Sequence, residues 1–275
     1  MALTLPISTI IIGNATTTPD YTLPSGIESG DFIVVVCSNE DTGGPPGAWN
    51  DAITSGWTLE VNEGSGVSDA HIGIYTKEAD GTEGGTTLEV SQDSSFENCA
   101  TVFVFRGAVA TSLHVIGTWA AVEGTQVTAS AIDTGSTDDC YILGICTFDG
   151  SLSSTTGPPY DGFSTATGGW SKDFYSYGTA DGDAGATSHA IFTKTQVTAG
   201  STGDLVVDTE ESNGLGAMQI AIAPAIAATY QYGRPMSDVL SGLLWKPAPS
   251  TYGLYNKIDE TVASDSEYIY YELGK

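Results

Sequence analysis

The stretch Asp31-Phe32-Ile33-Val34-Val35-Val36-Cys37 has a similar counterpart later in the chain, Asp139-Cys140-Tyr141-Ile142-Leu143-Gly144-Ile145-Cys146. Further segments repeat in the same order: Gly44-Pro45-Pro46 with Gly157-Pro158-Pro159, Gly56-Trp57 with Gly169-Trp170, 74–77 with 191–194, 88–90 with 205–207, and 100–105 with 217–222. The offset grows along the chain, as small loop insertions in the second copy would produce. Two copies of about a hundred residues are too few for a solenoid. They predict two related β-layers or two small sandwiches.

Strand signals recur at short intervals before residue 225, as runs of Val, Ile, Thr and aromatic residues between turn residues. The expected strands are 7–12, 31–37, 57–61, 70–77, 87–91, 99–105, 113–117, 125–131, 139–147, 170–176, 187–194, 204–208 and 216–223. Residues 102–105 and 142–145 are apolar throughout, so both faces of these strands should be covered. The sequence predicts an all-β protein, a jelly-roll-like β-sandwich built from an internal duplication with a C-terminal extension.

The predicted domain organisation separates a body at 1–225, with copies at about 7–108 and 111–225, from a segment at 226–275. This last segment holds half of the basic residues and many tyrosines, a composition typical of an interface. We expect it to be an arm, or part of a second module, that packs on the body or on a neighbour. The candidate partner-binding residues are Tyr230, Tyr232, Arg234, Trp245, Tyr252 and Tyr255.

The net charge of the chain limits the classes of partner that it can bind. It carries 8 basic and 34 acidic residues, a net charge of −26, which repels nucleic acid and anionic membranes. The N-terminus has neither a basic region nor a long apolar run, so we expect no signal peptide and no membrane span. The four cysteines lack a Cys-x-x-Cys pair and are expected to be buried free thiols in a protein made in a reducing cytoplasm.

Two tryptophans, Trp57 and Trp170, close the long loops that begin at the Gly-Pro-Pro segments. Each stands at the start of an apolar strand, which favours a structural plug at the end of the sandwich. The alternative is a platform on which a sugar ring stacks.

Catalytic and metal-binding patterns are weak in this sequence. His71 and His189 begin corresponding strands and His114 stands apart, but no Gly-x-Ser-x-Gly setting accompanies them. Paired acids are too common in so acidic a chain to indicate a glycosidase. The acidic segments 38–41 and 181–183 are expected in loops and could offer oxygen atoms to Ca²⁺, but they lack the spacing of a calcium loop. We therefore expect no enzyme activity, no cofactor and no metal.

The chain resembles a family of tailed-bacteriophage virion proteins. The resemblance rests on Gly30-Asp31-Phe32-Ile33-Val34-Val35-Val36, Gly56-Trp57-Thr58, Tyr75-Thr76-Lys77-Glu78-Ala79-Asp80-Gly81 and Phe105-Arg106-Gly107-Ala108, with weaker echoes ending Ile220-Ala221-Ile222-Ala223-Pro224-Ala225. A second phage pattern starts at Arg234-Pro235-Met236-Ser237-Asp238-Val239 and continues through Trp245-Lys246-Pro247 to Asp265-Ser266-Glu267-Tyr268-Ile269. In such proteins this pattern opens a further β module, of which only the first strand is expected here. The resemblance implies a structural protein of the particle without catalytic residues.

The functional expectation is a capsid decoration (cement) protein of a virion assembled in the host cytoplasm. Its expected partners are the major capsid protein and neighbouring copies of itself, with a homotrimer as one arrangement. The main alternative is a tail or fibre component that binds host-surface glycans through the loops ending at Trp57 and Trp170. A secreted adhesin or a carbohydrate module linked to an enzyme is a third alternative, disfavoured by the free cysteines.

Overall fold

The computed structural model describes residues 3, 7–12, 16–40, 49–64, 69–93, 97–109, 112–149, 162–165, 167–177 and 187–225. The regular secondary structure within these residues consists of β-strands alone, so the predicted all-β sandwich is confirmed. No helix with the length and apolar character of a membrane span occurs in that part of the chain. The C-terminal segment 226–275 lies outside the described residues.

The first sheet is built entirely from the first copy, and its strands are antiparallel. Its order is β1 (Ile7–Ile12), β7 (Asn98–Phe105), β3 (Phe32–Glu40), β5 (Ala70–Glu78) and β4 (Thr58–Gly64). The apolar run that opens the first copy forms β3, the central strand. Because β3 has a neighbour on each edge and a layer on each face, its residues 32–39 are all buried.

The second sheet is built from the second copy. Its strands are β8 (Val115–Ile116), β9 (Ala120–Ala129), β10 (Cys140–Asp149), β11 (Phe163–Thr165), β12 (Ser171–Tyr177), β13 (Thr187–Gln196) and β14 (Leu205–Ile222). The order is β11-β14-β10-β13-β12, and β8 and β9 also pair with β14. The central strand β10 is the counterpart of β3 and is buried over residues 140–148.

The two sheets therefore repeat one strand order, since β8 and β9, β14, β10, β13 and β12 stand where β1, β7, β3, β5 and β4 stand in the first sheet. The copies differ at one place. In the first copy β6 (Thr87–Glu89) is separate from β7 and pairs with β2 (Asp20–Thr22) in a small ladder. In the second copy the two predicted strands 204–208 and 216–223 are joined as β14, whose register against β9 shifts between Asp208 and Asn213. The expectation of two separate strands there was wrong.

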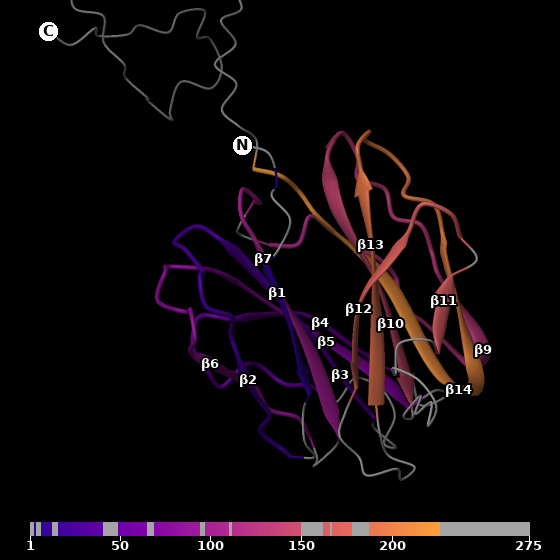
Figure 1. The fold of residues 1–275 in the computed structure, drawn as a ribbon, viewed down its shortest axis with the longest axis horizontal. Coiled ribbons are helices and arrows are strands. Elements are labelled where there is room, and N and C mark those ends of the chain that lie inside the picture. The colour runs from indigo at the N-terminus through magenta and orange to yellow at the C-terminus, as the bar shows by residue number, and fades with distance from the viewer. Residues whose placement is uncertain are drawn as a thin grey trace, which may run out of the picture. The chain divides into compact units, whose positions relative to one another are not determined.

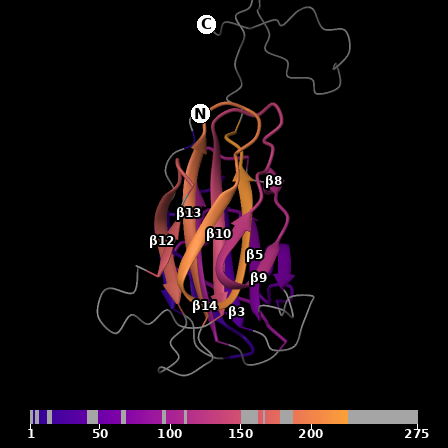
Figure 2. The same ribbon diagram turned by 90° about the vertical axis from the view of Figure 1, so that its right-hand side faces the viewer.

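The sheets pack face to face, so the first copy and the second copy lie on opposite sides of one core (Figure 1). Figure 2 views this arrangement from the second sheet, with β10, β13 and β14 in front. Strand β12 lies against β7 and β1, and β13 lies against β3 and β7. Aromatic pairs cross the interface, because Phe103 meets Phe174 edge-on with ring centroids 4.9 Å apart and Phe105 meets Tyr141 at 5.4 Å.

The outer face of each sheet is also covered. On the first sheet, Tyr21 of β2 and Leu88 of β6 join Ile33 and Val35 of β3 in a second apolar cluster. On the second sheet, Phe148 of β10 packs with Phe163 and with residues from the first half of β14. The covering layer is the separate β2–β6 ladder in the first copy, whereas in the second copy it belongs to the same seven-stranded sheet. All four cysteines are buried free thiols, as the sequence predicts.

Candidate functional site

The predicted anchoring residues Tyr230, Tyr232, Arg234, Trp245, Tyr252 and Tyr255 lie outside the described residues, as do the Gly-Pro-Pro segments. The structure therefore leaves the anchor assignment as a prediction. The body offers four other candidate centres. These are its tryptophans, its histidines, its few basic side chains and one group of acids.

The two tryptophans named from the sequence are half-buried. Trp57 packs on the outer apolar cluster of the first sheet. Trp170 packs on the outer face of the second sheet, where a Cβ atom at Gly144 would lie 3.0 Å from its ring. The Lys194 ammonium sits over this ring at 5.6 Å from the centroid, a cation–π distance. The described contacts of both rings are with the protein core, although each ring keeps an accessible part.

Among the tryptophans that the structure describes, Trp49 is the one that is fully buried, and it was not among the residues predicted from the sequence. Its ring meets Tyr75 edge-on, and a Cβ atom at Gly73 would lie 2.7 Å from its Cγ atom. Asn62 holds its backbone, donating from Nδ2 to the Trp49 carbonyl at 2.6 Å and accepting from its N–H at 3.3 Å. The signal available in the sequence was the glycine at position 73, which interrupts an otherwise bulky strand.

His189 lies on β13 between the two sheets and contacts the first copy through both ring nitrogens. Nδ1 is 2.9 Å from the Ser38 hydroxyl on β3, and Nε2 is 2.8 Å from the Thr101 hydroxyl on β7. The Cys99 thiol is 3.5 Å from Nδ1. The four side chains form the inter-sheet polar cluster, and each of them is fully buried.

This cluster contains a serine and a histidine in hydrogen-bond contact, which is the first requirement for a nucleophile and its base. The second requirement is an open approach for a substrate, and the complete burial of Ser38 and His189 denies it. Burial lowers the pKa of His189 to about 3, so the ring is neutral at pH 7. A neutral imidazole offers one donor and one acceptor, and the two hydroxyls match either tautomer. The cluster therefore fixes the register of one copy against the other.

The other two histidines have different surroundings. His71 on β5 is fully buried, and Gly64 on β4 lies so close that a Cβ atom there would be 2.1 Å from Nδ1. His114 precedes β8, and its Nε2 is 3.1 Å from the Thr134 carbonyl oxygen. The three histidines thus lie in three separate environments.

The body has 4 basic and 28 acidic residues over 1–225, and all four basic groups make internal contacts. Arg106 binds Asp31 with two parallel hydrogen bonds of 2.9 Å and reaches Glu28 at 3.0 Å. Burial alone would raise the pKa of Asp31, but the bonds from Arg106 and from the Glu28 N–H lower it below the ordinary value. This pair joins the start of β3 to the end of β7, two of the segments on which the phage resemblance rests.

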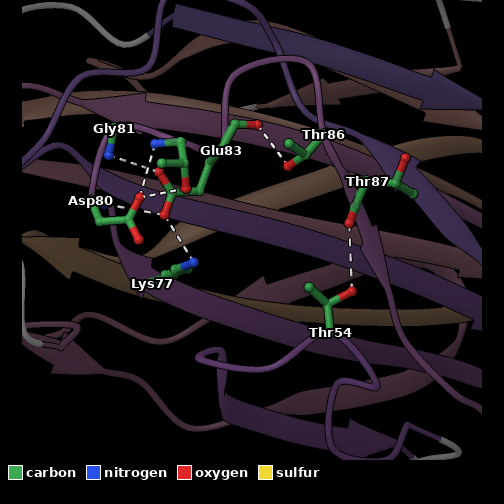
Figure 3. Close-up of polar contacts among 8 residues, drawn as sticks. Thr54, Lys77, Asp80, Gly81, Glu83, Thr86 and Thr87 are labelled. Atoms are coloured by element: carbon green, nitrogen blue, oxygen red, sulfur yellow. Dashed lines mark hydrogen bonds and ion pairs between the residues drawn. The ribbon is translucent and has the colours of Figure 1, made fainter.

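The second basic group, Lys77 at the end of β5, pairs with the buried carboxylate of Glu83 at 2.8 Å (Figure 3). The same carboxylate accepts the backbone N–H groups of Asp80 at 3.1 Å and Gly81 at 3.0 Å. Burial alone would raise the pKa of Glu83, yet these donors bring it down to about 2. The segment Lys77-Glu78-Ala79-Asp80-Gly81 thus forms a turn closed around one carboxylate.

The two remaining basic groups donate to backbone carbonyls. Lys172 Nζ donates to Phe163 at 2.8 Å, and Lys194 Nζ donates to Thr202. Since Lys77, Arg106, Lys172 and Lys194 are the only basic residues of 1–225, the body turns a strongly anionic surface to its surroundings.

Glu83→Gln is expected to lower the free energy of unfolding by about 2 kcal/mol, because the change weakens charge-assisted bonds in a buried turn. The folded pKa near 2 lies below the unfolded value, so this contribution is complete above about pH 5 and is lost as the pH falls towards 2. Urea denaturation at pH 7 and at pH 3 measures both effects. The exposed neighbour gives the control Glu78→Gln. Equal losses in the two variants would contradict the role of Glu83.

One group of acids spans both copies. The pKa of Asp149, at the end of β10, is raised to about 6 by burial and then by the charges of Asp69 and Glu123. Within the described ranges no three His, Cys, Asp or Glu side chains are grouped to hold a metal ion. In the acidic segment 38–41, expected to be a loop, residues 38–40 belong to β3. Ser38 binds His189 there, and Asn39 donates to Gln92 at 2.7 Å.

Comparison of the chain with protein-family models, with curated proteins and with solved structures finds no match.

Proposed function

We propose that the protein is a structural component of a phage virion, a capsid decoration protein whose body stands on the shell and whose segment 226–275 attaches it. The observation that supports this best is the commitment of all four basic residues of the body to internal contacts. The body therefore offers few basic groups to an acidic partner, since it has only these four against 28 acidic residues. The four other basic residues of the chain and a concentration of aromatic residues lie in 226–275.

The architecture is consistent with this division of labour. Two main sheets joined through a shared core and an inter-sheet polar cluster make a body in which residues 32–39, 98–105 and 140–148 are all buried. The proposed action is linkage, since a protein that binds only the assembled shell raises the free energy needed to open it. Many copies on one lattice act together, because each neighbouring site is presented at high effective concentration.

Decoration is tested by mixing the purified protein with shells that lack it and sedimenting the particles. The full chain is expected to co-sediment in hundreds of copies per particle and to raise the temperature at which the shells open. Residues 1–225 alone, and the full chain with Trp245→Ala and Tyr255→Ala, are expected to stay in the supernatant while keeping the circular dichroism of the body. Glu78→Gln, a change on the body, is the matched control that should still bind.

Binding by residues 1–225 alone would show that the anchor lies in the body and would contradict the role given to 226–275. A handful of copies located at the tail of native particles would contradict decoration and favour the tail or fibre alternative.

A further inference from the structure

The edge strands of the two sheets differ in how they are protected. An edge strand leaves a row of N–H and C=O groups without a partner, and proteins guard such edges with charges, bulges or short strands. Strand β4 carries Glu60 and Glu63, and its register against β5 shifts after Leu59. Strand β12 carries Lys172 and Asp173, and its register against β13 shifts between Lys172 and Phe174. Both of these edges are guarded.

The remaining edges of the second sheet and the small ladder are guarded as well. Strands β2, β6 and β11 have three residues each and β8 has two. The longer strand β9 carries Glu123, and its pairing with β14 is interrupted.

Strand β1 is the exception among the described strands. Its six residues, Ile7-Ser8-Thr9-Ile10-Ile11-Ile12, contain no charge, no proline and no glycine. Its pairing with β7 runs without a shift from Ile7 opposite Val104 to Ile12 opposite Cys99. Within the described ranges β1 pairs on that side only. Ile7 is 40% exposed, so this neutral strand reaches the surface of a strongly anionic body.

We infer that β1 pairs with β1 of a second copy, as two antiparallel strands related by a two-fold axis. The charge of the body selects this occupant. Each copy has a net charge of −26, so edge strands that carry glutamates would oppose like charges across the new ladder. The identical β1 strand places no charge there, and its Ile and Thr residues favour a sheet. Pairing at the edge also extends the sheet sideways, which keeps the two anionic bodies apart.

The inference rests on the proposed function in naming a neighbouring copy as the partner, and it predicts a dimer in place of the homotrimer, which was one arrangement considered for a decoration protein. Isologous two-fold contacts close on themselves, so the assembly stops at two copies. Screening of the repulsion between the bodies should favour association, because the Debye length falls from about 8 Å at physiological salt to about 3 Å at 1 M.

The test uses the full chain in sedimentation equilibrium from low to high concentration, in low salt and in 1 M salt. The expected result is a doubling of the 28.4 kDa mass that strengthens with salt. Thr9→Glu places a carboxylate in the middle of β1 and is expected to weaken the dimer by about tenfold or more. The matched control Thr58→Glu, on the edge strand β4, should leave it unchanged.

Hydrogen exchange of the unmodified protein gives a second measurement that does not depend on a variant folding. The amides of residues 7–12 should gain protection as the concentration rises, while those of 58–64 should not. A monomer at all concentrations, a trimer, or a dimer unaffected by Thr9→Glu would overturn the inference. Full protection of β1 at the lowest concentration would also overturn it, because another part of the chain would then cover the edge.

The two proposals fail separately. A monomer that still binds shells would contradict the β1 pairing alone. A dimer that does not bind shells would contradict decoration alone.

Discussion

Trp49→Ala is expected to lower the free energy of unfolding by about 3–5 kcal/mol, as for other fully buried aromatic residues. Trp49 is 1% exposed and belongs to the outer cluster of the first sheet. Its ring is pressed against Gly73, and a glycine has no side chain with which to refill the cavity. Denaturation in urea, followed by circular dichroism, measures the loss.

The half-buried Trp57 provides the matched control for this prediction. It packs on the same cluster from a more exposed position, so Trp57→Ala removes less contact and should cost clearly less. If both substitutions cost the same, the assignment of Trp49 as the central plug of this layer is incorrect.

Acidification from pH 7 to pH 5 is expected to reduce the stability of the body by about 2 kcal/mol through His189 alone. The folded pKa near 3 lies below the unfolded value near 6.5, so the unfolded chain binds more protons between these limits. Stability contributed by the neutral ring is complete above about pH 6.5 and decreases as the pH falls towards 3. The denaturant midpoint at pH 7 and at pH 5 reports the change.

His189→Gln separates this titration from the others. The variant loses stability at pH 7, because glutamine does not reproduce the bonds to both Ser38 and Thr101. Its further loss between pH 7 and pH 5 should be about 2 kcal/mol smaller than in the unmodified protein. An equal pH dependence in the two proteins would show that His189 does not titrate on unfolding.

Asp149 acts in the opposite direction over part of the same range. The pKa of Asp149 in the folded state is about 6, above the ordinary value of a carboxyl group. At neutral pH its charged carboxylate therefore destabilises the folded state, and this cost is relieved as the pH falls through 6. Asp149→Asn removes this contribution, so the effect of His189 should be measured in that background as well.

The fold was largely predictable from the sequence because its main strands are short apolar runs between turn residues. The runs at 102–105 and 142–145 are central and buried, as their uniform apolar character predicts. The strands β2 and β11 were not predicted, since three residues are too few for a periodic signal. The joining of 204–208 to 216–223 was missed because the polar residues between them read as a loop. In the structure these residues continue β14 along its exposed bend.

The polar interior was much less predictable. Along the chain, His189 is 151 residues from Ser38 and 88 residues from Thr101, its two hydrogen-bond partners. Only the face-to-face packing of the two copies brings them together, and no local pattern encodes that packing. The pair of Arg106 and Asp31 is a similar case, and both residues stand in segments that support the phage resemblance. Lys77 and Glu83 are only six residues apart, and of the two only Lys77 stands in such a segment. The bonds within both pairs required the structure.

The construction of each sheet from one half of the chain has a consequence for biosynthesis. All strands of the first sheet lie within residues 7–105, so this sheet can form while the ribosome is still translating the second half. Its inner face, which includes Val34, Ile74 and Phe103, stays uncovered until the second sheet has been synthesised. At about 5–20 residues per second that interval is on the order of 6–25 seconds. During this time the nascent chain exposes a hydrophobic surface, and such surfaces are prone to aggregate unless a chaperone binds them.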